Sequence, residues 1–347
     1  MLSTKTLETE STSLQSQFTR VPENARVTAV VPVHNRADLL RRMLETAAAQ
    51  TLPFGEIIVI DNASSDNAAQ VAEAFGCRIL RNSTNAGFAR AVNAGWRAAA
   101  TEWIAVLNSD IELDPEWLER LAACAEQMNA GFATGLILDA ASRTRIDGTY
   151  DLVSRAGCAW RAGHGQTVAP ESPSRIAMAP GTACLFRRSV LEQLGGYEES
   201  FESYLEDVDL GLRCVQHGIS GVFVPAAIAW HHGSATLGRW NPRLVRLISR
   251  NQLLLIARNY DSTLFRRSLW RIFVGQLLWG GVAARHGALL AWIAGKLDGV
   301  SKFRLTGYPS AALEAFLESS EQEIRERADD SYWRWYFRLT ANRGGAH

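Results

Sequence analysis

The chain has 347 residues, of which 47% are hydrophobic and 21% charged, values typical of a globular protein with one large domain and an appendage, or with two domains. Its 36 basic and 36 acidic residues give a formal net charge of zero, which argues against a nucleic-acid partner. The 5 cysteines contain no CxxC pair, which argues against a disulfide framework or a zinc ribbon and fits a reducing compartment.

The N-terminal segment, residues 1–25, is rich in Ser, Thr, Glu and Gln and contains no apolar run. This composition predicts a disordered tail and does not resemble a signal peptide.

From residue 26 onward the sequence alternates between strand and helix patterns. Four short apolar runs suit strands buried on both faces: 27–33, 56–61, 77–82 and 103–108. Apolar residues recur at helical spacing in the segments between them: 37–50, 64–75 and 87–100. A further helix is expected after the fourth strand, with Asp114 as its cap and Pro115 as its first residue. This alternation predicts an α/β fold with a mainly parallel sheet.

Polar residues follow three of the predicted strands, in the segments 32–36, 61–62 and 108–110. An isolated Asn or Asp at such a position is more often a helix cap. Ligands of such sheets bind outside the carboxyl ends of the strands, however, so the three segments together favour a binding site. Asp110 stands four residues before Asp114, so it is not needed as a cap. A carboxylate at this edge suits a hard divalent cation that is shared with substrate phosphates. The sequence has neither a GxxxxGK[ST] loop nor a GxGxxG after a strand, so no P-loop or dinucleotide fingerprint is expected.

Four segments together resemble, in this order, family 2 glycosyltransferases of GT-A fold, most nearly the bacterial rhamnosyltransferase-like branch. They are "VVPVHNRADLLRRMLETAAAQTLPFGEIIVIDNASSD", "NAGFARAVNAG", "LNSD" and "GTACLFRRSVLEQLGGYEESFESYLEDVDLGLRCVQHG". The resemblance continues weakly through "HHGSATLG" and "SRNQLLLIARN". It implies a Rossmann-like GT-A domain over residues 26–240, a mainly parallel sheet flanked by helices, followed by a helical region over 241–347.

The resemblance also implies a nucleotide-sugar site. Asp110 corresponds to the family's metal-binding carboxylate, for Mg²⁺ or Mn²⁺, and Asn108 stands where the first Asp of the family's Asp-x-Asp motif is usual. A further metal or diphosphate ligand is implied at His231 or His232. The two are alternatives, because neighbouring residues of a strand face opposite ways. The residues implied to bind the nucleotide sugar are Pro32, Val33, Asn35, Arg36, Asp61, Asn62, Gly87, Phe88, Asn93, Asn108, Ser109 and Asp110.

The acidic segment 204–218 has helical spacing, with Asp209 and Arg213 four residues apart as in an ordinary surface ion pair. Glu206 and Asp207 stand at the expected start of this helix, where the dipole alone favours acidic residues. The resemblance implies instead that Asp207 is a general base and Glu206 its acceptor-side partner. It also implies acceptor contacts at Gly181 and Thr182.

The activity implied is that of an inverting, metal-dependent glycosyltransferase. Its donor would be a dTDP- or UDP-linked sugar, rhamnose from dTDP-rhamnose first among them, and its acceptor a hydroxyl of a glycan or a lipid-linked saccharide in polysaccharide biosynthesis. Two alternatives are a sugar nucleotidyltransferase, which would need a Gly-rich loop after the first strand, and a non-catalytic glycan-binding scaffold. Asp110, Glu206, Asp207 and His231 together argue against the scaffold.

The last third of the chain predicts helices, at 244–260 and 264–305. The second is rich in Trp and basic residues, and its uncharged core over 272–284 is shorter than the ~20 residues that span a bilayer. Such a segment either packs on the domain or lies in a membrane interface. The expected location is cytoplasmic, free or peripheral on the inner face of the membrane. Residues 314–339 predict a surface helix.

Overall fold

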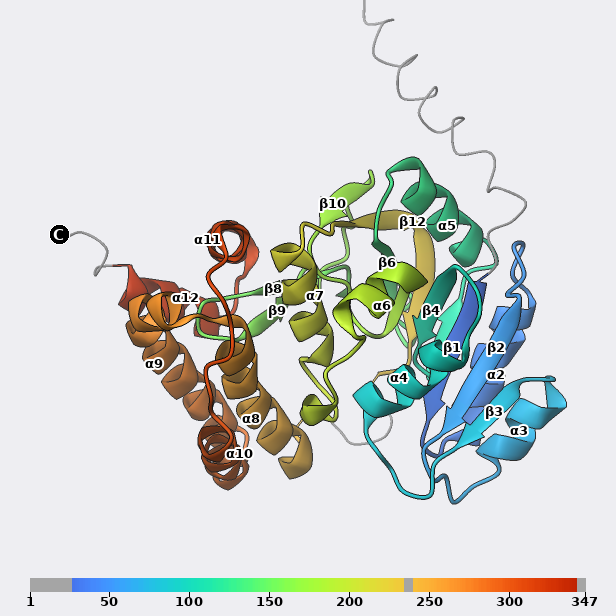
Figure 1. Ribbon diagram of the computed structural model, residues 1–347, viewed down its shortest axis with the longest axis horizontal. Helices are drawn as coiled ribbons and strands as arrows, with labels where there is room; N and C mark the ends of the chain where they lie inside the picture. The colour runs from blue at the N-terminus through green and yellow to red at the C-terminus, as the bar shows by residue number, and fades with distance from the viewer. Residues whose placement is uncertain (1–26, 234–239, 342–347) are drawn as a thin grey trace, which may run out of the picture.

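A computed structural model describes residues 27–233 and 240–341, so the expected tail over 1–25 lies outside the described residues. One sheet forms the centre of this part, and its strands follow the order β10-β12-β6-β11-β4-β1-β2-β3 (Figure 1). Its first four strands in the chain are mutually parallel, as predicted: β1 (Val27–Val33), β2 (Glu56–Asp61), β3 (Arg78–Arg81) and β4 (Trp103–Leu107).

Helices connect these parallel strands: α2 (Ala37–Ala48), α3 (Ala68–Ala74) and α4 (Phe88–Ala98). Helix α3 begins four residues later than the apolar spacing predicts. The carboxylate of Asp66 accepts hydrogen bonds from the backbone N–H groups of Ala37 and Ala68, at 2.9 and 3.1 Å. It therefore joins the starts of two helices instead of lying inside one.

The second half of the sheet is mixed: β5 (Ile111–Leu113), β6 (Phe132–Asp139), β7 (Ile146–Gly148), β10 (Ser174–Ile176), β11 (Ala183–Arg187) and β12 (Gly221–His231). Strand β11 runs antiparallel between β4 and β6, whereas β12 is parallel to β6. Strand β5 has no counterpart among the predicted elements; it pairs with the end of β12 and places His231 opposite Ile111. This pairing brings Asp110, in the turn between β4 and β5, close to the end of β12.

Helices cover both faces of the sheet: α5 (Trp117–Gln127), α6 (Arg188–Leu194) and α7 (Glu206–Gln216) complete the set in this half. Helix α5 begins at Trp117, so the prediction of Asp114 as its cap and Pro115 as its first residue is wrong. The Asp114 carboxylate accepts from the N–H of Glu116 in the preceding turn, at 3.1 Å. Two buried apolar clusters, one on each face, fill the space between helices and sheet.

The C-terminal helices lie together at one end of the molecule: α8 (Pro242–Asn259), α9 (Ser262–Arg285), α10 (Leu289–Ser301), α11 (Ala311–Arg327) and α12 (Ser331–Thr340) (Figure 1). The hairpin of β8 (Asp151–Val153) and β9 (Ala159–Arg161) lies between them and the sheet, next to α7. The single surface helix predicted over 314–339 is two helices, and both are anchored by buried side chains, among them Leu317, Trp333 and Tyr336. Among the described residues, no helix has the length and apolar character needed to cross a bilayer.

Candidate active site

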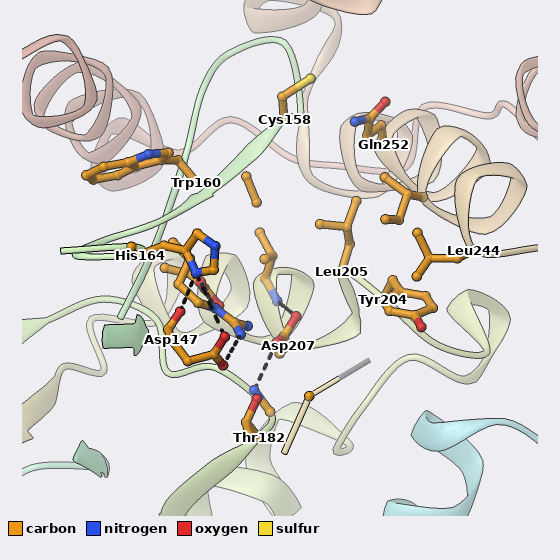
Figure 2. Close-up of a pocket in the computed structure, with 18 of the residues that line it drawn as sticks. Asp147, Cys158, Trp160, His164, Thr182, Tyr204, Leu205, Asp207, Leu244 and Gln252 are labelled. Atoms are coloured by element: carbon orange, nitrogen blue, oxygen red, sulfur yellow. Dashed lines mark hydrogen bonds and ion pairs between the residues drawn. The ribbon is translucent and has the colours of Figure 1, made fainter. Parts of the chain in front are cut away.

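A pocket of about 1140 Å³ opens where the sheet, α7 and the C-terminal helices meet. Figure 2 shows Asp147, Thr182 and Asp207 at one end of it and Cys158, Trp160, Leu244 and Gln252 at the other. The pocket therefore has an acidic end and a more apolar end. Eight residues predicted for the site line it together: Phe88, Asn108, Asp110, Gly181, Thr182, Glu206, Asp207 and His231.

At the acidic end, His231 bridges two carboxylates. Its Nε2 lies 3.3 Å from Oδ1 of Asp110, and its Nδ1 lies 2.9 Å from Oδ2 of Asp147. Burial disfavours the charged imidazole, but the hydrogen bonds to Asp110 and Asp147 outweigh burial and raise the pKa of His231 to about 9. Burial likewise opposes the charge on Asp147, yet the bond from His231 and the charge of Arg161 lower the pKa of Asp147 to about 2.

This arrangement fits a divalent cation held by two protein ligands. Asp110 offers an oxygen, and His231 offers a nitrogen from an adjacent position once a cation displaces the proton of its Nε2; Asp147 fixes the far side of the imidazole as carboxylates do behind metal-bound histidines. Within residues 27–233 and 240–341 no group of three or more His, Cys, Asp or Glu side chains could hold a metal. A cation here would complete its coordination with water and substrate phosphates, which is the usual mode for Mg²⁺.

The two histidines, which the sequence left as alternatives, face different ways. His232 turns to Glu112, whose Oε1 lies 2.8 Å from its Nε2. It does not line the pocket. The placement of His232 among the metal ligands is therefore corrected, because side chains alternate along β12 and β12 pairs with β5 beside it.

Asp207 and Glu206 stand at the first turn of α7 in different environments. The Asp207 carboxylate accepts from the N–H of Gly181 at 2.9 Å and from the N–H of Val208 at 2.8 Å. Glu206 is 5% exposed, and its Oε2 has no hydrogen-bond partner among the described residues. Burial, helped by the neighbouring charge of Asp207, raises the pKa of Glu206 well above its usual value. The surroundings of Glu206 therefore disfavour its charged form.

The segment before α7 is held by α8. Three non-glycine residues of this segment, Glu202, Tyr204 and Leu205, have positive φ angles, which cost free energy unless the surroundings impose them. The side-chain amide of Asn251 donates to the carbonyls of residues 201, 203 and 204, at 2.7 to 2.9 Å. Arg250 adds a 2.8 Å bond to the carbonyl of residue 201. Helix α8 thus helps to position the turn from which Asp207 reaches the pocket.

Gly87 supports the same segment from α4. Its φ is +84°, and a Cβ there would lie 2.7 Å from the carbonyl oxygen of Glu202. Gly165 has a similar φ of +81°, but no atom lies within 4 Å of a Cβ built on it.

These two glycines share a positive φ but differ in what an added Cβ would meet. We expect Gly165→Ala to cost about 1–2 kcal/mol of stability through its backbone conformation alone. Gly87→Ala should cost about 1–3 kcal/mol more, because its ψ of 168° with a positive φ is a conformation nearly restricted to glycine and because the segment at Glu202 must also move. Chemical denaturation of both variants measures the difference, and equal losses would contradict the role given to this contact.

Other residues predicted for the nucleotide sugar line the ends of β1 and β2 outside the pocket. Pro32 and Val33 are the last residues of β1. The Asn35 side chain accepts from the N–H of Ser65 at 2.7 Å. The Asp61 side chain accepts from the N–H of Ser64 at 2.9 Å. The loops after β1 and β2 are thereby joined into one edge, with Arg36 in the first of them and Ser109 in the turn after β4.

Two predicted donor contacts have internal partners. Asn93 is fully buried in α4, and its amide donates to the carbonyl of Tyr197 at 2.7 Å and accepts from the N–H of the same residue at 2.9 Å. The placement of Asn93 at the donor is therefore corrected: it fixes the segment before α7. Asn62 is buried too, and its amide bonds Asn82 and the backbone of Gly87.

The Asp209–Arg213 pair also differs from the prediction. The two side chains do pair, at 2.8 Å, but Asp209 is fully buried. Asn259 of α8 donates to its other oxygen at 3.0 Å. The expected surface ion pair is an internal link between α7 and α8.

Three residues of the acidic end have no counterpart in the sequence prediction: Asp147, Asp151 and Arg161. The guanidinium of Arg161 lies 3.2 Å from Asp151 and 3.9 Å from Asp147. Burial raises the pKa of Asp151 to about 6 despite the opposite charge of Arg161. A Cβ on Gly148 would lie 2.3 Å from Cδ of Arg161, so this glycine admits the arginine. The segment "RIDGTYD" that carries the two aspartates has no local feature that distinguishes it from a turn.

The fold is that of the GT-A class. Two solved structures share this fold. GalNAc-T7 with UDP, GalNAc and Mn²⁺ matches with a TM-score of 0.60 and 15% identity, over 92% of this chain and 57% of that one. The mannosyltransferase PcManGT from Pyrobaculum calidifontis, in complex with GDP-Man and Mn²⁺, matches with a TM-score of 0.51 and 17% identity, over 90% of this chain and 84% of that one.

Residues 28–195, just under half of the chain, match the family model described as "Glycosyl transferase family 2", so the chain contains a family 2 glycosyltransferase domain. The chain is 29% identical over 228 residues to the O-antigen biosynthesis protein RfbC of Myxococcus xanthus. The matched region covers 61% of this chain but 18% of that protein. It is 26% identical over 243 residues to the N-acetylglucosaminyl-diphospho-decaprenol L-rhamnosyltransferase of Mycobacterium tuberculosis. Here the matched region covers 61% of this chain and 79% of that protein.

Proposed function

We propose that this protein is an inverting, divalent-metal-dependent glycosyltransferase that moves a sugar from a nucleoside-diphosphate sugar to a hydroxyl group of a glycan or lipid-linked acceptor. One observation carries the proposal: the Asp110–His231 pair and the Asp207 carboxylate line the same pocket. The Asp110–His231 pair would hold a cation next to the charged diphosphate of a donor. The Asp207 carboxylate would accept the proton of an acceptor alcohol.

Asp110 and His231 would hold the cation, with Asn108 beside them and Asp147 orienting the imidazole. A bound Mg²⁺ or Mn²⁺ would act there as a Lewis acid toward the leaving diphosphate. The Mn²⁺ named with both solved glycosyltransferases of this fold supports a divalent cation in this class. The joined loops after β1 and β2 would bind the nucleotide, through residues such as Asn35, Arg36 and Asp61.

Asp207 would take the proton of the attacking hydroxyl. The bond from the acceptor oxygen to the anomeric carbon forms as the bond from that carbon to the diphosphate oxygen breaks, and the proton goes to a free lone pair of the Asp207 carboxylate. The bonds from Gly181 and Val208 fix the direction of this carboxylate. A single displacement through an oxocarbenium-like transition state inverts the anomeric centre and needs no nucleophilic carboxylate. Glu206 and the polar Thr182 would contact the acceptor.

Rhamnose from dTDP-rhamnose is the first donor to test, because the M. tuberculosis relative is named as an L-rhamnosyltransferase. The same relative's name includes a decaprenol-linked diphosphate, which supports a lipid-linked acceptor and work at the inner face of the cytoplasmic membrane in polysaccharide assembly.

The experiment screens dTDP-, UDP- and GDP-linked sugars with Mn²⁺ and Mg²⁺, first for thermal stabilisation and then for slow release of the nucleoside diphosphate. Stabilisation reports occupancy of the folded protein. We expect metal-dependent stabilisation by at least one donor, and release that the Asp207→Asn variant lacks. Stabilisation without release would indicate a non-catalytic binding protein. Formation of a sugar nucleotide and pyrophosphate from a nucleoside triphosphate and a sugar 1-phosphate would indicate a nucleotidyltransferase.

A further inference from the structure

We infer that the outward face of α9 and α10 docks on an anionic phospholipid surface. This face, called here the α9–α10 face, consists of Leu269, Phe273, Leu277, Leu290, Ile293 and Leu297. The inference rests on the proposed function, for which it names the partner surface and the side from which a lipid-linked acceptor arrives.

The apolar residues of the α9–α10 face follow helical stripes. On α9 they recur every four residues, and on α10 they are spaced by three and four. Phe273 is 55% exposed, Leu297 66% and Leu290 80%, although large apolar side chains on a helix normally pack against the protein. The two helices follow one another across a short turn, and Gly280 of α9 lies against the ring of Trp292 of α10. The exposed stripes thus belong to a packed helical pair.

Charge favours an anionic partner for this region. Residues 262–305 contain seven Lys and Arg residues against a single acid, Asp298, in a chain whose formal net charge is zero. Arg267 and Arg271 pair with Glu314 and Glu321 of α11, and Lys296 bonds inward to Ser249 and Gln252, which leaves four basic residues: Arg266, Arg285, Lys302 and Arg304. Asp298 itself pairs with Arg246 of α8. Basic residues stand at the helix ends next to the apolar stripes: Arg266, Arg285 and Lys302 are exposed. A basic helix with an apolar face binds the interface of anionic bilayers, where each Lys or Arg adds about 1 kcal/mol.

The same charges oppose self-association through this face. Two copies joined there would bring together the basic residues that have no acidic partner in the described structure, Arg266, Arg285, Lys302 and Arg304, from both copies. A lipid surface avoids this repulsion. Since no helix of the described ranges could cross a bilayer, the contact would lie in the headgroup region.

Helix α9 also connects this face to the pocket. Trp279 and Val282, on its inner side, line the pocket together with Leu244 and Ile248 of α8. Trp279 donates to the hydroxyl of Ser249 at 3.0 Å, which fixes its ring against α8. One side of α9 therefore forms the apolar wall of the pocket while the other would contact lipid. A sugar linked to a lipid anchor would pass beside α9 and reach Asp207 while its anchor stays in the membrane.

The test is flotation of the full-length protein with vesicles, in the absence of donor. We expect binding to vesicles of phosphatidylglycerol and phosphatidylethanolamine at least about tenfold tighter than to phosphatidylcholine, and weaker in high salt. Leu290→Ser should lower binding about threefold or more, and Phe273→Ser combined with Leu290→Ser and Leu297→Ser at least about tenfold. Val168→Ser is the matched control, because Val168 is also 80% exposed but lies outside the α9–α10 face. Circular dichroism checks that each variant is folded.

Equal binding by the triple variant and the wild type would overturn the inference, as would equal affinity for neutral and anionic vesicles. A dimer in solution that Leu290→Ser dissociates would also overturn it, by showing that a second copy covers this face. Metal-dependent release of nucleoside diphosphate, which needs no membrane, is measured in parallel. Vesicle binding without any such release would count against the proposed activity and leave the docking inference standing.

Discussion

Asp207→Asn is expected to lower sugar transfer by about 10²–10⁴-fold while the affinity for the donor stays nearly unchanged. The amide keeps the shape of the side chain and can still accept the N–H of Gly181 or Val208, so α7 and the segment before it should hold. It has no charge with which to take a proton from the acceptor. Steady-state rates and calorimetric donor titrations measure the two quantities separately.

The neighbouring carboxyl supplies the comparison. Glu206→Gln makes the same chemical change one residue away, at a carboxyl whose pKa burial already raises well above its usual value. Because burial disfavours a charge on this carboxyl, it is poorly suited to take a proton, and we expect a loss of less than about tenfold. Equal losses of transfer in the two variants, or a parallel loss of donor affinity in Asp207→Asn, would contradict the assignment of the base to Asp207.

The strand exits were the part of the site that local sequence could predict. A strand buried on both faces has an apolar run that ends abruptly, and parallel strands bring their carboxyl ends to one edge. That reasoning placed Asn108 and Asp110 correctly at the pocket. Asp207 came from the family resemblance alone, since acidic residues at a helix start are common for reasons unrelated to catalysis.

The acidic network behind His231 could not be predicted, because its members meet only through distant pairings. Asp147 reaches the site through the pairing of β7 with β6, and Arg161 through the separate β8–β9 hairpin. The sequence of a single segment does not indicate that these residues lie close together in the fold. The same reason explains Asp209: spacing within α7 predicts its partner Arg213, but only the packing of α8 makes the pair internal.

Asn93 shows the converse error. A polar side chain within a motif shared with donor-binding enzymes was expected to contact the ligand, yet it faces the protein. Its amide satisfies the backbone of Tyr197, and its oxygen also accepts from the indole of Trp96 at 2.9 Å. Buried polar groups need such partners. A motif residue can therefore belong to the site by holding the chain that carries the catalytic groups.

Asp110→Ala and His231→Ala are each expected to abolish the effect of Mn²⁺ on donor binding. Both residues would contribute a ligand to one cation, and two protein ligands leave no reserve when one is removed. Donor affinity should fall by about 10–100-fold in the presence of Mn²⁺ and change little in its absence. Calorimetric titration of the donor with and without Mn²⁺ measures this difference.

The adjacent histidine is the control for this experiment. His232→Ala removes the same side chain from the next position of β12, where it bonds Glu112 and does not line the pocket. This variant should lose the contact with Glu112 and keep the full effect of Mn²⁺ on donor affinity. Loss of the response in His232→Ala, or its survival in Asp110→Ala, would remove the Asp110–His231 pair from the cation's coordination. The alternation of side chains along one strand, which left the choice open in the sequence, thus becomes the means of testing it.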